Sequence, residues 1–337
     1  MPARDHFAFV YTGFRPFALF AIALMAAAPA RAAGTLEPFC GLGYGSTLYR
    51  LEMTFPLTAP DSVVLNGKGL GQSELEYPLD AMLVGFRYRQ EFAGIGLRLG
   101  AWTNATAPIG KMQDSDWMGE RSSSGLSTTS VLFKFSYTQS RAEMRWLGGE
   151  AGADIAGGMF LGKPLRYGLS VRAEHLNYRL FGAEGWHRMP GEAQQDVAFA
   201  SDTLVLTYRL TRVMPRLFSE LRLAESSAIL FTVGLSAGPA FAWDHDDHVL
   251  RHKYSDTYAF GFEAGGTAGM ELRVSPHMAL AAGLELAYFR SKGKMDQFFY
   301  GDDPGSDEDE TGTGYKGIVT RIIGLGGGAT LGARYLF

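Results

Sequence analysis

The sequence predicts an all-β chain that forms a transmembrane antiparallel β-barrel of about ten strands with long extracellular loops. Three observations support this prediction. The chain starts with an export signal, its body alternates apolar with small or polar residues, and short and long connections alternate along it. Together these features are typical of barrels that cross a bacterial outer membrane.

Residues 1–32 have the three parts of a secretory signal peptide. Two arginines supply early positive charge, residues 17–28 are apolar, and residues 30–32 (Ala-Arg-Ala) form a small-x-small cleavage site. A retained membrane anchor is the alternative, but the apolar run is short for a span. We therefore assign residues 33–337 to a single barrel domain.

Composition narrows the classes of protein that fit. Without residues 1–32 the chain has 28 basic and 34 acidic residues, a net charge near −6, which gives no reason to expect nucleic-acid binding. Cys40 is the single cysteine, so an intramolecular disulfide framework is excluded and a free, buried thiol is expected. No apolar stretch of about 20 residues follows the signal, so the sequence predicts no transmembrane helix there.

Strict alternation predicts the strands. Apolar residues alternate with small, polar or charged ones in segments 39–52, 81–89, 95–104, 203–211, 229–238 and 278–289. Arginines and glutamates occur on the less apolar face. That face would line a polar lumen in a barrel or meet bulk water in a soluble sandwich, and periodicity alone does not separate the two.

The spacing of the connections favours the barrel. Short turn-like breaks occur at residues 92–94, 162–164, 225–227 and 275–277, and long polar connections at about 54–72, 105–127, 183–201, 244–256 and 291–317. Their alternation is that of outer-membrane barrels with short periplasmic turns and extended outer loops. The last strand ends at Phe337 in a polar-x-Gly-x-x-aromatic-x-Phe pattern, which resembles the signal read by the barrel assembly machinery and predicts outer-membrane localisation.

Two acidic clusters carry the candidate chemistry. Asp114 and Asp116 follow the third predicted strand. The polar face of strand 229–238, continued past Pro239, brings Asp244, Asp246 and His248 to one surface. If the first strand runs outward, odd-numbered strands end outside, and both clusters lie at the extracellular rim.

Crowded carboxylates repel each other, so one of them is expected to hold a raised pKa and to act as a base. A histidine two residues from an aspartate on one strand face can be oriented by it and can shuttle a proton. Calcium binding or simple solvation are the alternatives for each cluster. A metal shared by His245 and His248 is disfavoured because alternation puts them on opposite faces. The acidic run at residues 302–310 predicts a solvated loop without a catalytic role.

The two clusters together resemble a known family. Asp-x-Asp-Trp-Met at residues 114–118 and Asp-x-Asp-acid-His at 244–248 are similar to the motifs of the omptins, outer-membrane endopeptidases of Gram-negative bacteria. Weaker matches agree in order: residues 73–77, the turn at 160–164, and Tyr208 with residues 214–215. The resemblance implies a ten-stranded barrel that extends above the membrane and cleaves polypeptide substrates in a groove at its outer end.

The resemblance also implies residue roles. Asp246 and His248 correspond to a catalytic dyad, and Asp114 with Asp116 to the facing couple that positions the attacking water. Asp244 corresponds to an acid that binds a basic substrate side chain. No metal or cofactor is implied, whereas lipopolysaccharide is implied as an activating lipid and partner.

Three departures from the family pattern modify these expectations. Tyr49 stands where the family has a second pocket acid, so Tyr49 is assigned to substrate binding and a relaxed preference for Lys or Arg is predicted. The loop signature is reduced at residues 137–140, and the fifth-strand signature of the lipopolysaccharide site is reduced at residues 174–178. The alternative function is a catalytically inactive barrel that acts as an adhesin or passive porin. A lipid hydrolase is a weaker idea, because no Ser-His arrangement is present.

Overall fold

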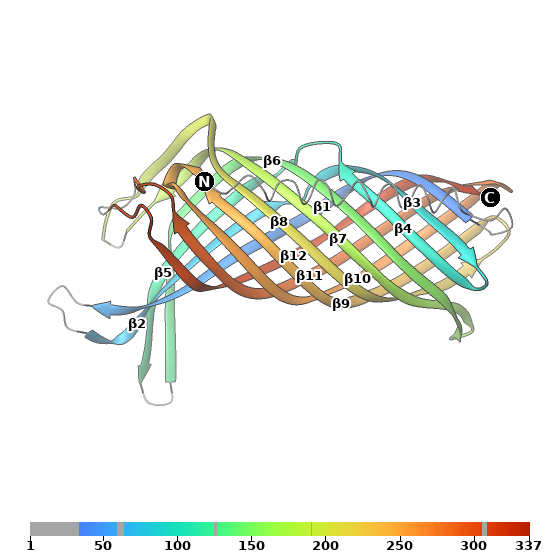
Figure 1. Cartoon of the computed structure of the whole chain (residues 1–337), viewed down its shortest axis with the longest axis horizontal. Coiled ribbons are helices and arrows are strands. Elements are labelled where there is room, and N and C mark those ends of the chain that lie inside the picture. The colour runs from blue at the N-terminus through green and yellow to red at the C-terminus, as the bar shows by residue number, and fades with distance from the viewer. Residues whose placement is uncertain (1–33, 59–63, 125–126, 190, 305–308) are drawn as a thin grey trace.

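The computed structural model describes residues 34–58, 64–124, 127–189, 191–304 and 309–337 (Figure 1). The predicted signal peptide lies outside these residues. Among the residues described, no helix is long and apolar enough to cross a membrane. The elements are β1 (Gly34–Thr58), β2 (Val64–Pro78), β3 (Ala81–Phe92), β4 (Ile95–Asn104), β5 (Lys111–Ser124), β6 (Ser127–Phe160), β7 (Lys163–His187), β8 (Gln195–Glu225), β9 (Ile229–His248), the 3-10 turn η1 (Val249–Arg251), β10 (Lys253–Ser275), β11 (Met278–Phe299) and β12 (Gly314–Leu336).

The strands close into one antiparallel ring. From β12 to β6 each strand pairs with its neighbour in sequence, and β12 also pairs with β1. Between β6 and β1 the ring is completed by β4 and β3 in one half and by β5 and β2 in the other. β2 and β3 both pair with β1, one in each half of the barrel, and β4 and β5 both pair with β6 in the same way. A section through either half therefore crosses ten strands. The predicted all-β barrel of about ten strands is confirmed.

The four predicted short breaks are tight hairpin turns at one end of the barrel, where the C-terminus also lies (Figure 1). They join β3 to β4, β6 to β7, β8 to β9 and β10 to β11. Two of them place consecutive residues at positive φ: Ala93 at 47° with Gly94 at 88°, and Leu161 at 50° with Gly162 at 69°. Positive φ at both central residues matches the right-handed twist of the paired strands.

The long polar connections are in large part strand rather than loop. Residues 111–124 form β5, β9 continues to His248, and β11 continues to Phe299. Asp114 therefore lies within a strand, which corrects its expected placement in a loop, and Asp246 lies on the continued strand β9. The apolar alternation stops before the hydrogen-bonded ladder does, because these strand ends are held by pairing with their neighbours and their lumen face carries polar residues.

The barrel has its apolar face outward. On β9 most odd-numbered side chains between Ile229 and Trp243 are exposed, with Leu235 at 70% and Trp243 at 39%, whereas the even-numbered Ala240, Ala242, Asp244 and Asp246 are buried. The alternation thus continues in phase past Pro239, as predicted. An outward apolar band that ends at an aromatic residue is the pattern of a lipid-facing barrel and not of a soluble sandwich. Cys40 lies on the outward face of β1 and is exposed, so the expected buried thiol is wrong.

Aromatic side chains close the lumen below the acidic residues. Tyr49 of β1, Tyr77 of β2, Tyr178 of β7 and Tyr208 of β8 are each fully buried. The rings of Tyr77 and Tyr208 stack with centroids 4.1 Å apart, and Tyr178 lies 5.1 Å from Tyr77. We call these four residues the tyrosine plug. Since they come from both sides of the ring, they form a layer across the barrel.

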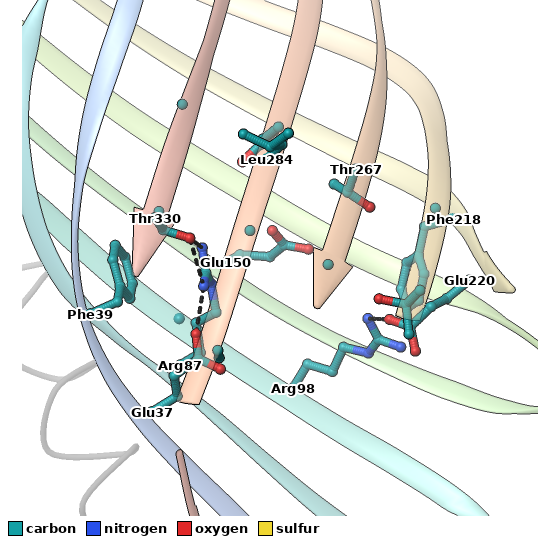
Figure 2. A pocket seen from close by; sticks show the side chains of 18 of the residues that line it. Glu37, Phe39, Arg87, Arg98, Glu150, Phe218, Glu220, Thr267, Leu284 and Thr330 are labelled. Atoms are coloured by element: carbon teal, nitrogen blue, oxygen red, sulfur yellow. Dashed lines mark hydrogen bonds and ion pairs between the residues drawn. The ribbon is translucent and has the colours of Figure 1, made fainter. Parts of the chain in front are cut away.

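The other half of the lumen holds ion pairs around a cavity of about 620 Å³ (Figure 2). Arg98 binds Glu220 at 3.1 Å, and Arg87 binds Glu37 at 2.7 Å. Gly324, Gly326 and Gly328 of β12 form part of the cavity wall. The cavity lining runs from Phe337 at the turn end up to Met214 near the plug.

The tyrosine plug predicts that the barrel does not conduct ions. In planar bilayers we expect no conductance steps from the native protein, and discrete steps when Tyr77 and Tyr208 are both changed to alanine, because the cavity would then join the outer end. Tyr258, which faces outward and is exposed, provides the control: Tyr258→Ala should stay silent. Porin-like conductance from the native chain would show that the plug is not a seal.

Candidate active site

The strand β9 presents an aspartate–histidine pair at its end. Asp246 and His248 share the lumen face, and His248 Nε2 lies 3.1 Å from Asp246 Oδ2. Asp246 is only 2% exposed, and the chain turns into η1 directly after His248. The strand is paired on both sides at this point, with Tyr208 of β8 and Ser255 of β10 opposite Asp246. The pair is therefore held by backbone ladders and not by a loop.

The second carboxylate pair comes from a distant part of the ring. Asp114 and Asp116 lie two residues apart on β5, so they share a face. Asp114 pairs with Leu75 of β2 and Thr138 of β6, and Asp116 pairs with Ser73 of β2. Going round the ring, three strands separate β5 from β9 one way and five the other way. The two pairs therefore lie on opposing walls.

The walls are within electrostatic reach of each other. Burial raises the pKa of Asp114 well above its usual value, and the negative charges of Asp116 and Asp246 raise it further. Burial also raises the pKa of Asp116, against which a hydrogen bond from Ser73 and the positive charge of His248 act. The predicted raised carboxyl pKa is confirmed in direction. Its larger cause is burial, and crowding of like charges is second.

Asp244 lies one step deeper on the same face of β9. It is 5% exposed, and neither of its carboxylate oxygens has a hydrogen bond of normal length in the described part of the chain. The Thr257 hydroxyl of β10, opposite Asp244 in register, is the polar group beside it. Burial raises the pKa of Asp244 well above its usual value, and the nearby negative charge of Asp246 raises it further.

Tyr49 reaches the same place from β1. Its hydroxyl lies 2.9 Å from Thr257 Oγ1 and donates to Met295 Sδ at 3.0 Å. Thr257 thus stands between Tyr49 and Asp244. The structure brings all six predicted site residues together around one end of the lumen, and the 620 Å³ cavity, on the other side of the tyrosine plug, is lined by none of them.

His245 and Asp247 point away from this site. His245 Nδ1 lies 2.8 Å from Asp256 Oδ1, and the Tyr300 hydroxyl donates to Asp247 at 3.1 Å. Both are odd-numbered positions on the outward face of β9, as alternation predicts. His245 and His248 therefore do not converge on one metal ion.

Sequence reasoning missed three charged residues near the site. Arg251 in η1 binds Asp303 of the β11–β12 loop, and Lys253 on β10 lies opposite His248 in register. Asp303 is only 1% exposed, so the expectation that the acidic run 302–310 is a solvated loop is wrong for this residue. No spacing in the sequence indicated this contact, because residues 251 and 303 meet only when two outer connections fold together.

The ring and its outward apolar face define a closed antiparallel β-barrel of the outer-membrane class, with the acidic residues gathered at one end. No protein-family model and no curated protein sequence matches the chain. Among solved structures, the outer membrane protease OmpT from Escherichia coli matches with a TM-score of 0.68 and 12% identity, over 90% of this chain and 97% of that one. At this identity the match shows the fold.

Two other solved structures match far less well. The outer membrane protein OprG from Pseudomonas aeruginosa has a TM-score of 0.28 and 10% identity, over 89% of this chain and 95% of that one. The beta domain of the Bordetella autotransporter BrkA has a TM-score of 0.26 and 12% identity, over 90% and 98%. The fold assignment therefore uses the OmpT match alone.

Proposed function

We propose that this protein is an outer-membrane endopeptidase that cleaves peptides or proteins at the cell surface. The observation that carries the proposal is the convergence of the Asp246–His248 pair with the Asp114–Asp116 couple on opposing walls of one barrel. Neither pair alone would distinguish catalysis from a solvated acidic strand. Together they offer a histidine that can accept a proton and a facing pair of carboxylates that can orient a water.

The contacts suggest how the chemistry would run. With His248 Nε2–H donating to Asp246, Nδ1 carries the lone pair and can take a proton from an attacking water. Asp114 and Asp116 lie two residues apart on one face of β5, so an ionised oxygen of this couple can accept the second hydrogen of that water. The water oxygen then attacks the peptide carbonyl, and His248 returns its proton to the leaving amine. These steps use only side chains of this chain, with no cofactor.

The outer face is the proposed location of the site. Short turns lie on the periplasmic side of outer-membrane barrels, and the acidic site lies at the opposite end from the four tight hairpins (Figure 1). Intact cells displaying the protein should therefore cleave an added peptide too large to enter the periplasm. Cleavage seen only after cell disruption would contradict this orientation.

A cleavage profile tests the proposal as a whole. The barrel is refolded with lipopolysaccharide, which the family resemblance implies as an activating lipid, and is incubated with a peptide library. Release of new amino termini at defined sites supports the endopeptidase. A folded protein that cleaves nothing would favour the inactive alternative, an adhesin. A passive porin would require an open lumen, and the tyrosine plug argues against one.

Replacing Tyr49 should change which residues are preferred at the cut. Tyr49 carries no charge at the position where the family has an acid, so we expect Tyr49→Glu to add a negative charge beside Asp244 and to sharpen the preference for Lys and Arg. The measurement is the cleavage profile of the variant against native protein. Tyr49→Phe is the matched control, because it removes the hydroxyl contacts without adding charge. An unchanged profile for Tyr49→Glu would show that Tyr49 does not line the pocket.

A further inference from the structure

We infer that Asp303 is a positioning residue that, with the turn η1, holds the cations Arg251 and Lys253 against the carboxylates of the acidic site. This inference deepens the proposed function and rests on it. The cations would keep the buried carboxylates ionised at a pH where burial alone would protonate them. We call Asp303, Arg251 and Lys253 the clamp. It joins the β9–β10 and β11–β12 connections, which meet only in the folded barrel.

Several contacts fasten the clamp. Arg251 Nη2 and Nε lie 2.7 and 2.8 Å from the same oxygen of Asp303, whose side chain is fully buried. The backbone N–H of Tyr300 donates to the His252 carbonyl at 2.8 Å, and His252 Nδ1 lies 2.7 Å from the Asp302 carbonyl oxygen. His252 adopts the left-handed conformation, with φ at 47°. That turn of the backbone separates Arg251 and Lys253 and lets both lie near the site.

Lys253 is placed by strand pairing. It lies directly opposite His248 in the β9–β10 ladder, and side chains directly opposite each other project to the same face of a sheet. Its Nζ also lies 5.7 Å from the centre of the Phe299 ring. Burial, together with the nearby positive charge of Arg251, lowers the pKa of Lys253 to about 8, against the opposing effect of Asp303, Asp246 and Asp116. Lys253 is thus a half-buried ammonium whose charged neighbours are Asp303 of the β11–β12 loop, Asp246 of β9 and Asp116 of β5.

The charged groups around the two cations come from every wall of the site. They are Asp114 and Asp116 on β5, Asp246 and His248 on β9, and Asp303 in the β11–β12 loop, while β8 contributes Tyr208 opposite Asp246. The positive charges of Arg251 and Lys253 both lower the pKa of Asp114 and of Asp116, whereas burial raises it. The clamp therefore opposes the larger effect of burial.

The sign of the expected pH effect follows directly. Removing a positive charge lets the pKa of the facing carboxyls rise, so the ionised state is reached only at higher pH. The acidic limb of the activity profile must then move to higher pH, with recovery above it. Asp303→Asn should act mainly by releasing Arg251, whose positive charge lowers the pKa of Asp114 and of Asp116. The lost charge of Asp303 itself matters less, because Asp303 is not among the groups that shift these two pKa values.

The test is the pH dependence of kcat/KM for peptide cleavage. Arg251→Gln and Asp303→Asn should each shift the acidic limb upward by about one pH unit, with near-native activity at mildly basic pH. Arg251→Lys should restore part of the shift. Asp302→Asn is the matched control, because Asp302 is the exposed neighbour in the same loop and bears the same charge. Its profile should overlay the native one.

Two outcomes overturn the inference in a folded, cleaving enzyme. One is a profile for Asp303→Asn that coincides with that of Asp302→Asn. The other is an equal loss at every pH, which would make Asp303 a purely structural residue. If the native protein cleaves no peptide, the proposed function fails instead. NMR titration of the aspartate carboxyl carbons then decides the inference by itself: raised midpoints in Arg251→Gln support the clamp, and unchanged midpoints overturn it.

Discussion

Changing His248 to alanine should lower kcat/KM for peptide cleavage by about 10²- to 10⁴-fold, the usual contribution of a positioned general base. The loss is expected because His248, held 3.1 Å from Asp246, is the group that can take a proton from water in this site. Asp114→Ala should cause a loss of similar size, because it removes half of the facing couple. Refolded variants are compared by initial rates on one fluorogenic peptide.

The strand itself supplies the control for this experiment. His245 and Asp247 lie on β9 within three residues of Asp246 and His248 but on the outward face. His245→Ala and Asp247→Asn should therefore retain activity within a few-fold of the native protein, whereas Asp246→Asn should not. If His248→Ala cleaves as well as the native enzyme while remaining folded, the proposed mechanism is wrong. Equal losses for both histidine variants would instead indicate damage to the strand.

Removing Asp154 should produce the largest loss of stability. Asp154 is fully buried in the lumen and accepts from Arg89 at 3.0 Å, from Arg98 at 2.5 Å and from Arg166. Asp154→Ala would leave three guanidinium groups without their shared counter-charge. Breaking a buried ion pair from one side typically costs about 3–5 kcal/mol. The measurement is urea unfolding of the barrel in lipid vesicles, followed by tryptophan fluorescence.

An exposed ion pair calibrates this prediction. Glu225 binds Arg222 at 3.4 Å at the turn end of β8, where both side chains are partly in water. Glu225→Ala should change the free energy of unfolding by less than about 1 kcal/mol, because solvent screens the pair and its side chains are mobile. A similar cost for Asp154→Ala and Glu225→Ala would show that the lumen network is solvated rather than packed.

The tight turns and the site strand were the parts of the fold most open to prediction. Ala93-Gly94 and Leu161-Gly162 occur where the chain reverses within two residues, and a glycine in such a short break predicts a tight turn. The placement of Asp244, Asp246 and His248 on one face needed only period-two geometry. The extent of β5 was not predictable in the same way, because its polar residues carry no apolar alternation and its pairing with β2 and β6 is non-local.

The sequence by itself determined the barrel, the direction of its hairpins and the residues that share the lumen face of β9, since each follows from local periodicity and turn chemistry. Only the tertiary structure decided that Tyr49 stands beside Asp244 through Thr257 and that Asp303 reaches Arg251. These contacts join strands or loops that lie tens to hundreds of residues apart. Their geometry depends on ring closure and strand register, which no local pattern in the sequence encodes.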